Sequence, residues 1–192
     1  MTELQKALII PLALVILIPA SILLYFAENI KGYYRFKWYC ENEGGLKIYE
    51  KLEKNVGWMA EDKLDAMAAS HLKYVKFVRY PEKKEQGKLY DLVYQGGNPS
   101  SFKSHEITPA NFTETIKYKW VVINSKIENE LRLEKYGYEI FYFENSNYIA
   151  KYYSFGYSIF NRKKTFLSAP SGSGCFNEPG MWKKEINKIF KN

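Results

Sequence analysis

The stretch from Ala7 to Ala27 contains 21 residues and no charged side chain. As an α-helix it would be roughly 31 Å long, which matches a hydrocarbon core about 30 Å thick. A cleaved signal peptide has a shorter apolar region followed by small residues at its cleavage site, and this stretch ends without such a pattern. We therefore expect a transmembrane anchor over 7–27, preceded by a short N-terminal tail over 1–6.

The segment 28–39, directly after the apolar stretch, interleaves aromatic and basic side chains. Tyr and Trp favour the headgroup level of a bilayer, and Lys and Arg reach anionic phosphates. We expect the segment to lie at a membrane interface, while the competing interpretation, a stripe that binds nucleic acid, uses the same residue types. The residues expected at the interface are Tyr33, Tyr34, Arg35, Lys37 and Trp38.

The charges around the apolar stretch and the character of the following domain favour opposite orientations. More basic residues follow the stretch than precede it, which by the positive-inside rule favours a cytoplasmic C-terminal domain. The six-residue start is typical of an uncleaved export signal, and the domain contains a cysteine pair and many strand-like, Tyr-rich segments. We expect the domain to lie outside the cytoplasm.

Residues 40–192 are expected to form one basic domain. Of the 28 basic and 21 acidic residues, only Lys6, Glu3 and Glu28 precede residue 31, so residues 31–192, which include this domain, have a formal charge of +8. This balance favours anionic neighbours such as lipid headgroups, cell-wall polymers or acidic proteins, without itself indicating nucleic acid.

Hydrophobic periodicity then predicts the elements of this domain. The fold class is α+β: a single N-terminal transmembrane helix, a mainly antiparallel sheet, one internal helix and a C-terminal amphipathic helix. Strands are expected over 46–52, 88–94 and 118–124, a helix over 60–74, loops through the rest of 81–117, and a final helix carrying Trp182, Ile186, Ile189 and Phe190.

A β-hairpin is the clearest local prediction, with strands over 132–143 and 148–157 and a polar turn between them. Alternate residues of a strand point to opposite faces, and both faces of this hairpin are largely apolar. Such a hairpin is either covered on both sides or leaves an aromatic face open to a partner. The candidate partner surface consists of Tyr138, Tyr142, Tyr152 and Tyr157.

Cys40 and Cys175 are the two cysteines of the chain. A disulfide between them would close nearly the whole domain. The alternative makes Cys175 a nucleophile, because the glycine-rich residues before it offer backbone N–H groups to an oxyanion. That alternative needs His71 or His105 as a base, and the spacing of these residues does not predict their contact.

Other chemistry has little support in the sequence. The two His and two Cys include no close pair of metal ligands, so we expect no metal site and no cofactor. Phosphate-binding and nucleophile-elbow motifs are missing from the sequence. The carboxylates are numerous enough to supply a pair for glycan hydrolysis, but their pairing is not visible in the sequence.

Two segments carry a family resemblance. Residues 38–50 (WYCENEGGLKIYE), together with a Tyr-rich hairpin that carries Ala150-Lys151-Tyr152 and precedes Ser171-Gly172-Ser173-Gly174-Cys175, resemble uncharacterised membrane-anchored or lipoprotein-like small envelope proteins of Gram-negative bacteria. The resemblance implies an envelope location, here the bacterial inner membrane with a periplasmic C-terminal domain, and it supports pairing of Cys40 with Cys175. It implies no activity or ligand.

We therefore expect a non-enzymatic, membrane-anchored envelope protein. Its partners would be membrane lipid and a protein or envelope component, in the role of an accessory subunit, an inhibitor or an immunity protein. The alternative is an envelope-polymer hydrolase that uses Cys175 or a carboxylate pair. A membrane-tethered nucleic-acid binder is the lesser alternative, supported by charge alone.

Overall fold

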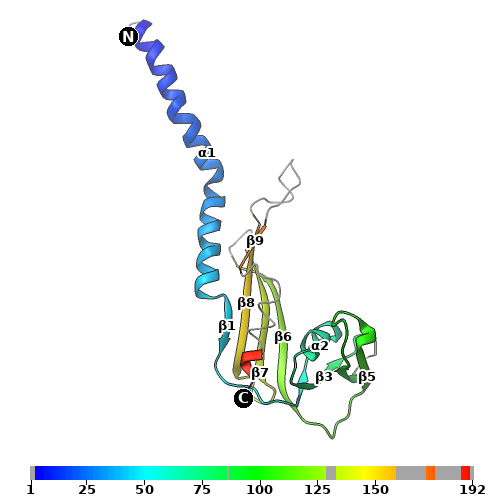
Figure 1. Cartoon of the computed structure of the whole chain (residues 1–192). Coiled ribbons are helices and arrows are strands. Elements are labelled where there is room, and N and C mark those ends of the chain that lie inside the picture. The colour runs from blue at the N-terminus through cyan, green and yellow to red at the C-terminus, as the bar shows by residue number, and fades with distance from the viewer. Residues whose placement is uncertain (1–2, 86, 129–132, 159–171, 176–186, 191–192) are drawn as a thin grey trace.

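The computed structural model describes residues 3–85, 87–128, 133–158, 172–175 and 187–190 (Figure 1). It contains a long N-terminal helix, a mixed β-sheet and a few short helices. The helical elements are α1 (Glu3–Asn42), α2 (Lys63–Ser70), and the 3₁₀ turns η1 (Phe102–Ser104) and η2 (Asn187–Ile189). The strands are β1 (Gly45–Ile48), β2 (Val56–Met59), β3 (Val75–Pro81), β4 (Leu89–Tyr94), β5 (His105–Pro109), β6 (Ile116–Lys126), β7 (Leu133–Tyr142), β8 (Tyr148–Ser158) and β9 (Gly172–Gly174).

Helix α1 corrects the prediction of a membrane anchor. In the described part of the chain, no helix is both long and apolar enough to cross a membrane. The transmembrane span over 7–27 and the single-pass inner-membrane location with a periplasmic domain are therefore not supported. The apolar stretch instead continues, without a break, into the segment 28–39, so that one helix runs from Glu3 to Asn42.

The second half of α1 packs on the sheet, which is why it does not end with the apolar stretch. Phe36 is buried, and its ring stacks on Tyr157 of β8 at 5.9 Å. Gly32 lies so close to the same tyrosine that a β-carbon would come within 2.8 Å of its ring. Residues expected at a membrane interface thus belong to a helix that contacts β8.

The strands of the described residues form one sheet in the order β1-β8-β7-β6-β2-β3-β4-β5, with β9 also paired to β8. β2 is parallel to both of its neighbours, β3 and β6, whereas the other pairings are antiparallel. The fold is therefore a mixed sheet, which corrects the predicted class of a transmembrane helix with an attached domain. β6, β7 and β8 are the longest of these strands and lie side by side (Figure 1).

The main core lies on the face of the sheet that α2 covers. Alternation along β6 and β7 directs Trp120, Tyr138 and Ile140 to this face. Asp62 caps α2, its side chain accepting hydrogen bonds from the backbone N–H groups of Leu64 and Asp65. Apolar residues of α2 then pack on the strands, and Ile189 and Phe190 close the core from the C-terminal end.

Some of the predicted helices and strands are present in the structure. The hairpin is confirmed as β7 and β8, and the internal helix is confirmed but is shorter than predicted. The strands over 46–52, 88–94 and 118–124 correspond to β1, β4 and β6, whereas β2, β3, β5 and β9 were not predicted. Trp182 and Ile186 of the predicted C-terminal helix lie outside the described residues, and Asn187–Ile189 form a 3₁₀ turn.

Candidate functional site

A pocket of about 280 Å³ lies between the end of α1 and the outer face of β6, β7 and β8. α1 reaches this face because its second half packs on β8, and the strands bring residues that are distant in sequence to one place. The pocket is lined by Tyr39, Glu43, Ser125, Lys126, Ile127, Glu128, Lys135, Tyr153 and Phe155.

Three aromatic rings form the apolar wall of the pocket. The Tyr39 ring lies 5.2 Å from the Phe155 ring, and Tyr153 and Phe155 are buried. They belong to a second apolar cluster, on the α1 side of the sheet, which also contains Phe36 and Tyr157. This wall is fixed by packing and is therefore largely formed before any ligand arrives.

A buried polar contact orients Tyr153. Its hydroxyl donates a hydrogen bond to the Glu139 carboxylate, to which Tyr148 also donates at 3.4 Å. Burial, and then the contact with Glu139, raise the pKa of Tyr153 far above its usual range. The phenol is therefore neutral at any physiological pH and serves as a hydrogen-bond donor, not as a base.

Basic and acidic side chains surround the apolar wall. The Lys135 ammonium lies 4.3 Å from the centre of the Tyr153 ring, a cation–π contact, and Lys151 approaches the same ring at 5.2 Å. Lys126 and Glu128 are exposed, and Glu43 is half-buried. The rim of the pocket thus offers two cations, Lys126 and Lys135, and two carboxylates, Glu43 and Glu128. This arrangement suits a polar segment on either side of an inserted apolar group.

The Cys40–Cys175 disulfide is confirmed, and it supports one side of the pocket. Cys40 follows Tyr39 directly, and the Cys175 N–H donates to the Phe155 carbonyl at 3.0 Å. The Ser154 hydroxyl donates to the Cys175 carbonyl at 3.2 Å. Because its sulfur is bonded to Cys40, Cys175 is not the thiolate nucleophile that was considered from the sequence.

The two histidines lie together, but away from the cysteines. The rings of His71 and His105 are 6.5 and 5.4 Å from the Tyr94 ring, and each Nδ1 lies within hydrogen-bond distance of a backbone carbonyl. No group of three or more His, Cys, Asp or Glu side chains among the described residues is arranged to hold a metal ion.

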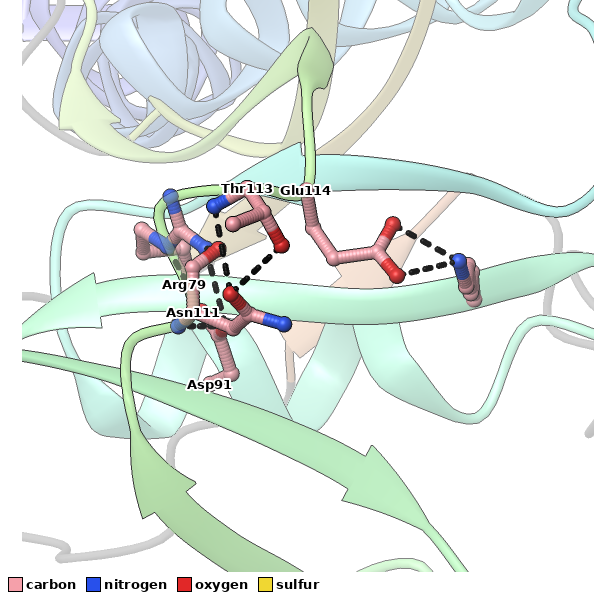
Figure 2. Close-up of polar contacts among 6 residues, drawn as sticks. Arg79, Asp91, Asn111, Thr113 and Glu114 are labelled. Carbon is pink, nitrogen blue, oxygen red and sulfur yellow. Dashed lines mark hydrogen bonds and ion pairs between the residues drawn. The ribbon is translucent and has the colours of Figure 1, made fainter.

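A second polar cluster joins β3, β4 and the loop 110–115 (Figure 2). Arg79 Nε and Nη2 donate to the two carboxylate oxygens of Asp91 at 2.6 and 2.8 Å, and both side chains are buried. Nη2 also donates to the Asn111 carbonyl at 2.6 Å, while the Asn111 N–H donates to Asp91 at 2.8 Å. This bidentate ion pair fixes the loop to the sheet.

The residues of the predicted partner surface do not form one exposed face. Tyr138 and Tyr157 are 6% and 3% exposed, on opposite sides of the sheet. Tyr142 and Tyr152 are half-buried at the edge of the main core. The Tyr138 ring stacks between Trp120 and Tyr152, so these side chains mainly hold the strands together.

Residues of the predicted membrane interface lie along α1. Phe36, which was not among them, is buried against β8, whereas the five predicted side chains lie around the exposed part of the helix. Their membrane role depended on the anchor over 7–27 and loses its basis with it. The exposed residues are Tyr33, Tyr34, Arg35, Lys37 and Trp38.

The pocket was not predicted from the sequence. One sequence signal pointed toward it: Lys135, Tyr153 and Phe155 occupy alternate positions of the hairpin and therefore share a face. That Tyr39 completes the wall depends on the packing of α1, which no local pattern shows. Comparison of the chain with protein-family models, with curated proteins and with solved structures found no match.

Proposed function

We propose that this protein is a non-enzymatic binding protein, and that its pocket receives an aromatic side chain of a protein partner. The observation that carries the proposal is the pocket itself: an aromatic wall of Tyr39, Tyr153 and Phe155 with a rim of mixed charge. Aromatic side chains are frequent anchors at protein interfaces because they bury a large area at a low cost in conformational entropy.

The size of the pocket supports an aromatic occupant. A cavity of about 150 Å³ with apolar walls is large enough to bind benzene. The volume of about 280 Å³ therefore accommodates a phenyl or phenol ring together with part of its backbone. Rings prefer tilted or offset neighbours at centroid separations of about 4.5–7 Å, and Tyr39, the half-buried ring of the wall, offers such a neighbour.

The charged rim supports a peptide, since a peptide places polar groups on both sides of its anchor residue. Lys126 and Lys135 would face acidic neighbours of the anchor, and Glu43 and Glu128 would face basic ones. Rim charges of this kind contribute mostly to orientation and association rate and less to affinity.

A peptide titration tests the proposal. The full-length protein is titrated with acetyl-Lys-Phe-Glu-amide and, for comparison, with acetyl-Lys-Ala-Glu-amide, and binding is followed by NMR of the backbone amides. We expect saturable shifts around the pocket with the Phe peptide and at least tenfold weaker binding of the Ala peptide. Equal binding of both peptides, or shifts confined to other surfaces, would contradict the proposal.

Ser125 and its neighbour in the sequence, Asn124, supply a matched pair of variants. Ser125 is exposed and lines the pocket, so Ser125→Trp should fill part of it and weaken binding of the Phe peptide. Asn124 is equally exposed but points to the opposite face of β6, so Asn124→Trp should leave binding unchanged. The two variants place the same bulk on the same strand and differ only in the face.

A further inference from the structure

Among the residues whose side-chain exposure the structure describes, Phe112 is the most exposed large apolar one, with 76% of its surface accessible. It lies in the loop 110–115 between β5 and β6. A single exposed apolar side chain is ordinary on a protein surface. Phe112 differs from an ordinary one because the loop that presents it is held in place on both sides.

The polar cluster of Figure 2 holds this loop. Asn111 exchanges hydrogen bonds with Arg79 and Asp91 through its backbone, and its side-chain oxygen accepts from the N–H and the hydroxyl of Thr113 at 3.1 and 2.8 Å. On the other side of Phe112, Lys76 of β3 donates to both carboxylate oxygens of Glu114 at 2.8 and 2.7 Å. Little conformational entropy is therefore lost when the loop docks.

The Phe112 ring itself is oriented by the same cluster. The Arg79 guanidinium carbon lies 5.3 Å from the centre of the ring, a cation–π contact, and Phe77 lies against the guanidinium at 5.4 Å. Since Arg79 is buried and fixed by Asp91, the ring rests on a rigid support. The rest of the ring faces away from the protein.

The ring and the pocket of the same chain are too far apart to meet. Phe112 lies just before the first residue of β6, Ile116, whereas Ser125 and Lys126 at the pocket are the last residues of that strand. A strand of 11 residues is about 35 Å long, and β6 is a long strand of the sheet (Figure 1). A contact between the two therefore needs two copies of the chain.

We infer that Phe112 of one copy inserts into the pocket of a second copy, head to tail. The inference rests on the proposed function, because it names the partner of the same pocket. The Lys76–Glu114 pair beside Phe112 brings one cation and one carboxylate to a rim that carries two of each, Lys126 and Lys135 with Glu43 and Glu128. Both surfaces thus carry charges of both signs beside an aromatic group.

This contact has a definite consequence for assembly. The two surfaces are different, so the contact is heterologous, and repeating it gives a ring or an open chain but not a symmetric dimer. Each copy uses its Phe112 in one contact and its pocket in another. Damage to either surface stops growth at a different end of the chain.

Sedimentation velocity of the full-length protein over a range of concentrations tests this arrangement. We expect concentration-dependent growth for the wild type, and for Phe112→Ala an association about 30-fold weaker, the loss typical of an aromatic anchor. Phe102→Ala is the matched control, because Phe102 is also an exposed phenylalanine with a lysine over its ring. Growth that persists in Phe112→Ala, or that falls equally in both variants, overturns the inference.

Mixing two defective variants gives the sharpest result. Phe112→Ala retains the pocket and Ser125→Trp retains the ring, so neither should grow alone, and their mixture should form dimers and stop there. A photoreactive benzoylphenylalanine in place of Phe112 should, in addition, cross-link to pocket peptides of an isotope-labelled second copy. Cross-links to other surfaces only, or no dimers in the mixture, overturn the inference.

The outcomes for the two proposals can be told apart. If the Phe peptide binds the pocket but the chain does not associate through Phe112, the self-assembly is wrong and the binding function stands. If neither occurs, both are wrong.

Discussion

At the scale of single residues, the Arg79–Asp91 ion pair is a sensitive point because it is buried. Replacing Arg79 by Met leaves the Asp91 carboxylate buried with only the Asn111 N–H as a partner, and removing one member of such a pair costs about 3–5 kcal/mol of unfolding free energy. Lys76→Met breaks an ion pair whose two side chains are 48% and 40% exposed, and should cost less than about 1 kcal/mol. Urea denaturation compares the two variants, and similar losses would contradict the prediction.

A second prediction at this scale concerns the titration of Tyr142. Its hydroxyl donates to the Glu50 carboxylate at 2.7 Å, and this bond, followed by burial, raises the pKa of Tyr142 to about 12. The contact therefore stabilises the folded protein below pH ~10, and this stabilisation is lost as the pH rises through about 12. Glu50→Gln should lower the pKa of Tyr142 toward 10, as measured by ¹³C NMR of the tyrosine ring with Tyr142→Phe for assignment. An unchanged pKa would contradict the assigned cause.

At the scale of elements, the pairing of β7 with β8 depends on Gly137. This residue has a φ of +151°, and a β-carbon on it would lie 1.9 Å from the Tyr152 carbonyl oxygen of the neighbouring strand. Gly137→Ala should therefore destabilise the fold by about 3 kcal/mol or more. Gly87, with a φ of +78°, has no atom within 4 Å of the same position, so Gly87→Ala should cost only about 1–2 kcal/mol. Thermal unfolding of the two variants gives the comparison.

The sequence predicts well those elements that have a strong local pattern. The hairpin of β7 and β8 shows alternating aromatic residues and a polar turn, and both signals are contained in one short segment. β2 has only four residues, and its parallel pairing with β3 and β6 leaves no mark on its own sequence. β3 follows α2 closely, and the helical spacing of apolar residues continues in the sequence to Tyr74, although α2 ends at Ser70.

At the scale of the whole molecule, the candidate site was beyond the reach of sequence patterns. Its residues come from α1, β6, β7 and β8, and only packing of α1 along β8 brings Tyr39 to Phe155. The prediction of a membrane anchor rested on the apolar stretch over 7–27 alone, whereas α1 continues past this stretch into residues that contact the sheet. The cysteine pairing was predictable because two cysteines allow only one intrachain disulfide.

That disulfide determines the last prediction. Cys40 and Cys175 are 135 residues apart, and a cross-link closing so long a loop stabilises the fold by about 5 kcal/mol in the chain-entropy model. The double variant Cys40→Ala, Cys175→Ala should lose most of this stabilisation. A dithiol reductant should lower the stability of the wild type by a similar amount and leave the stability of the variant unchanged. Because Cys40 adjoins Tyr39, and Cys175 is bonded to the backbone of Phe155, reduction should also weaken binding of the Phe peptide. Urea denaturation and the peptide titration, each with and without reductant, measure the two effects. If the reductant lowers the stability but leaves peptide binding intact, α1 is held at the pocket by the packing of Phe36 and Tyr39 alone.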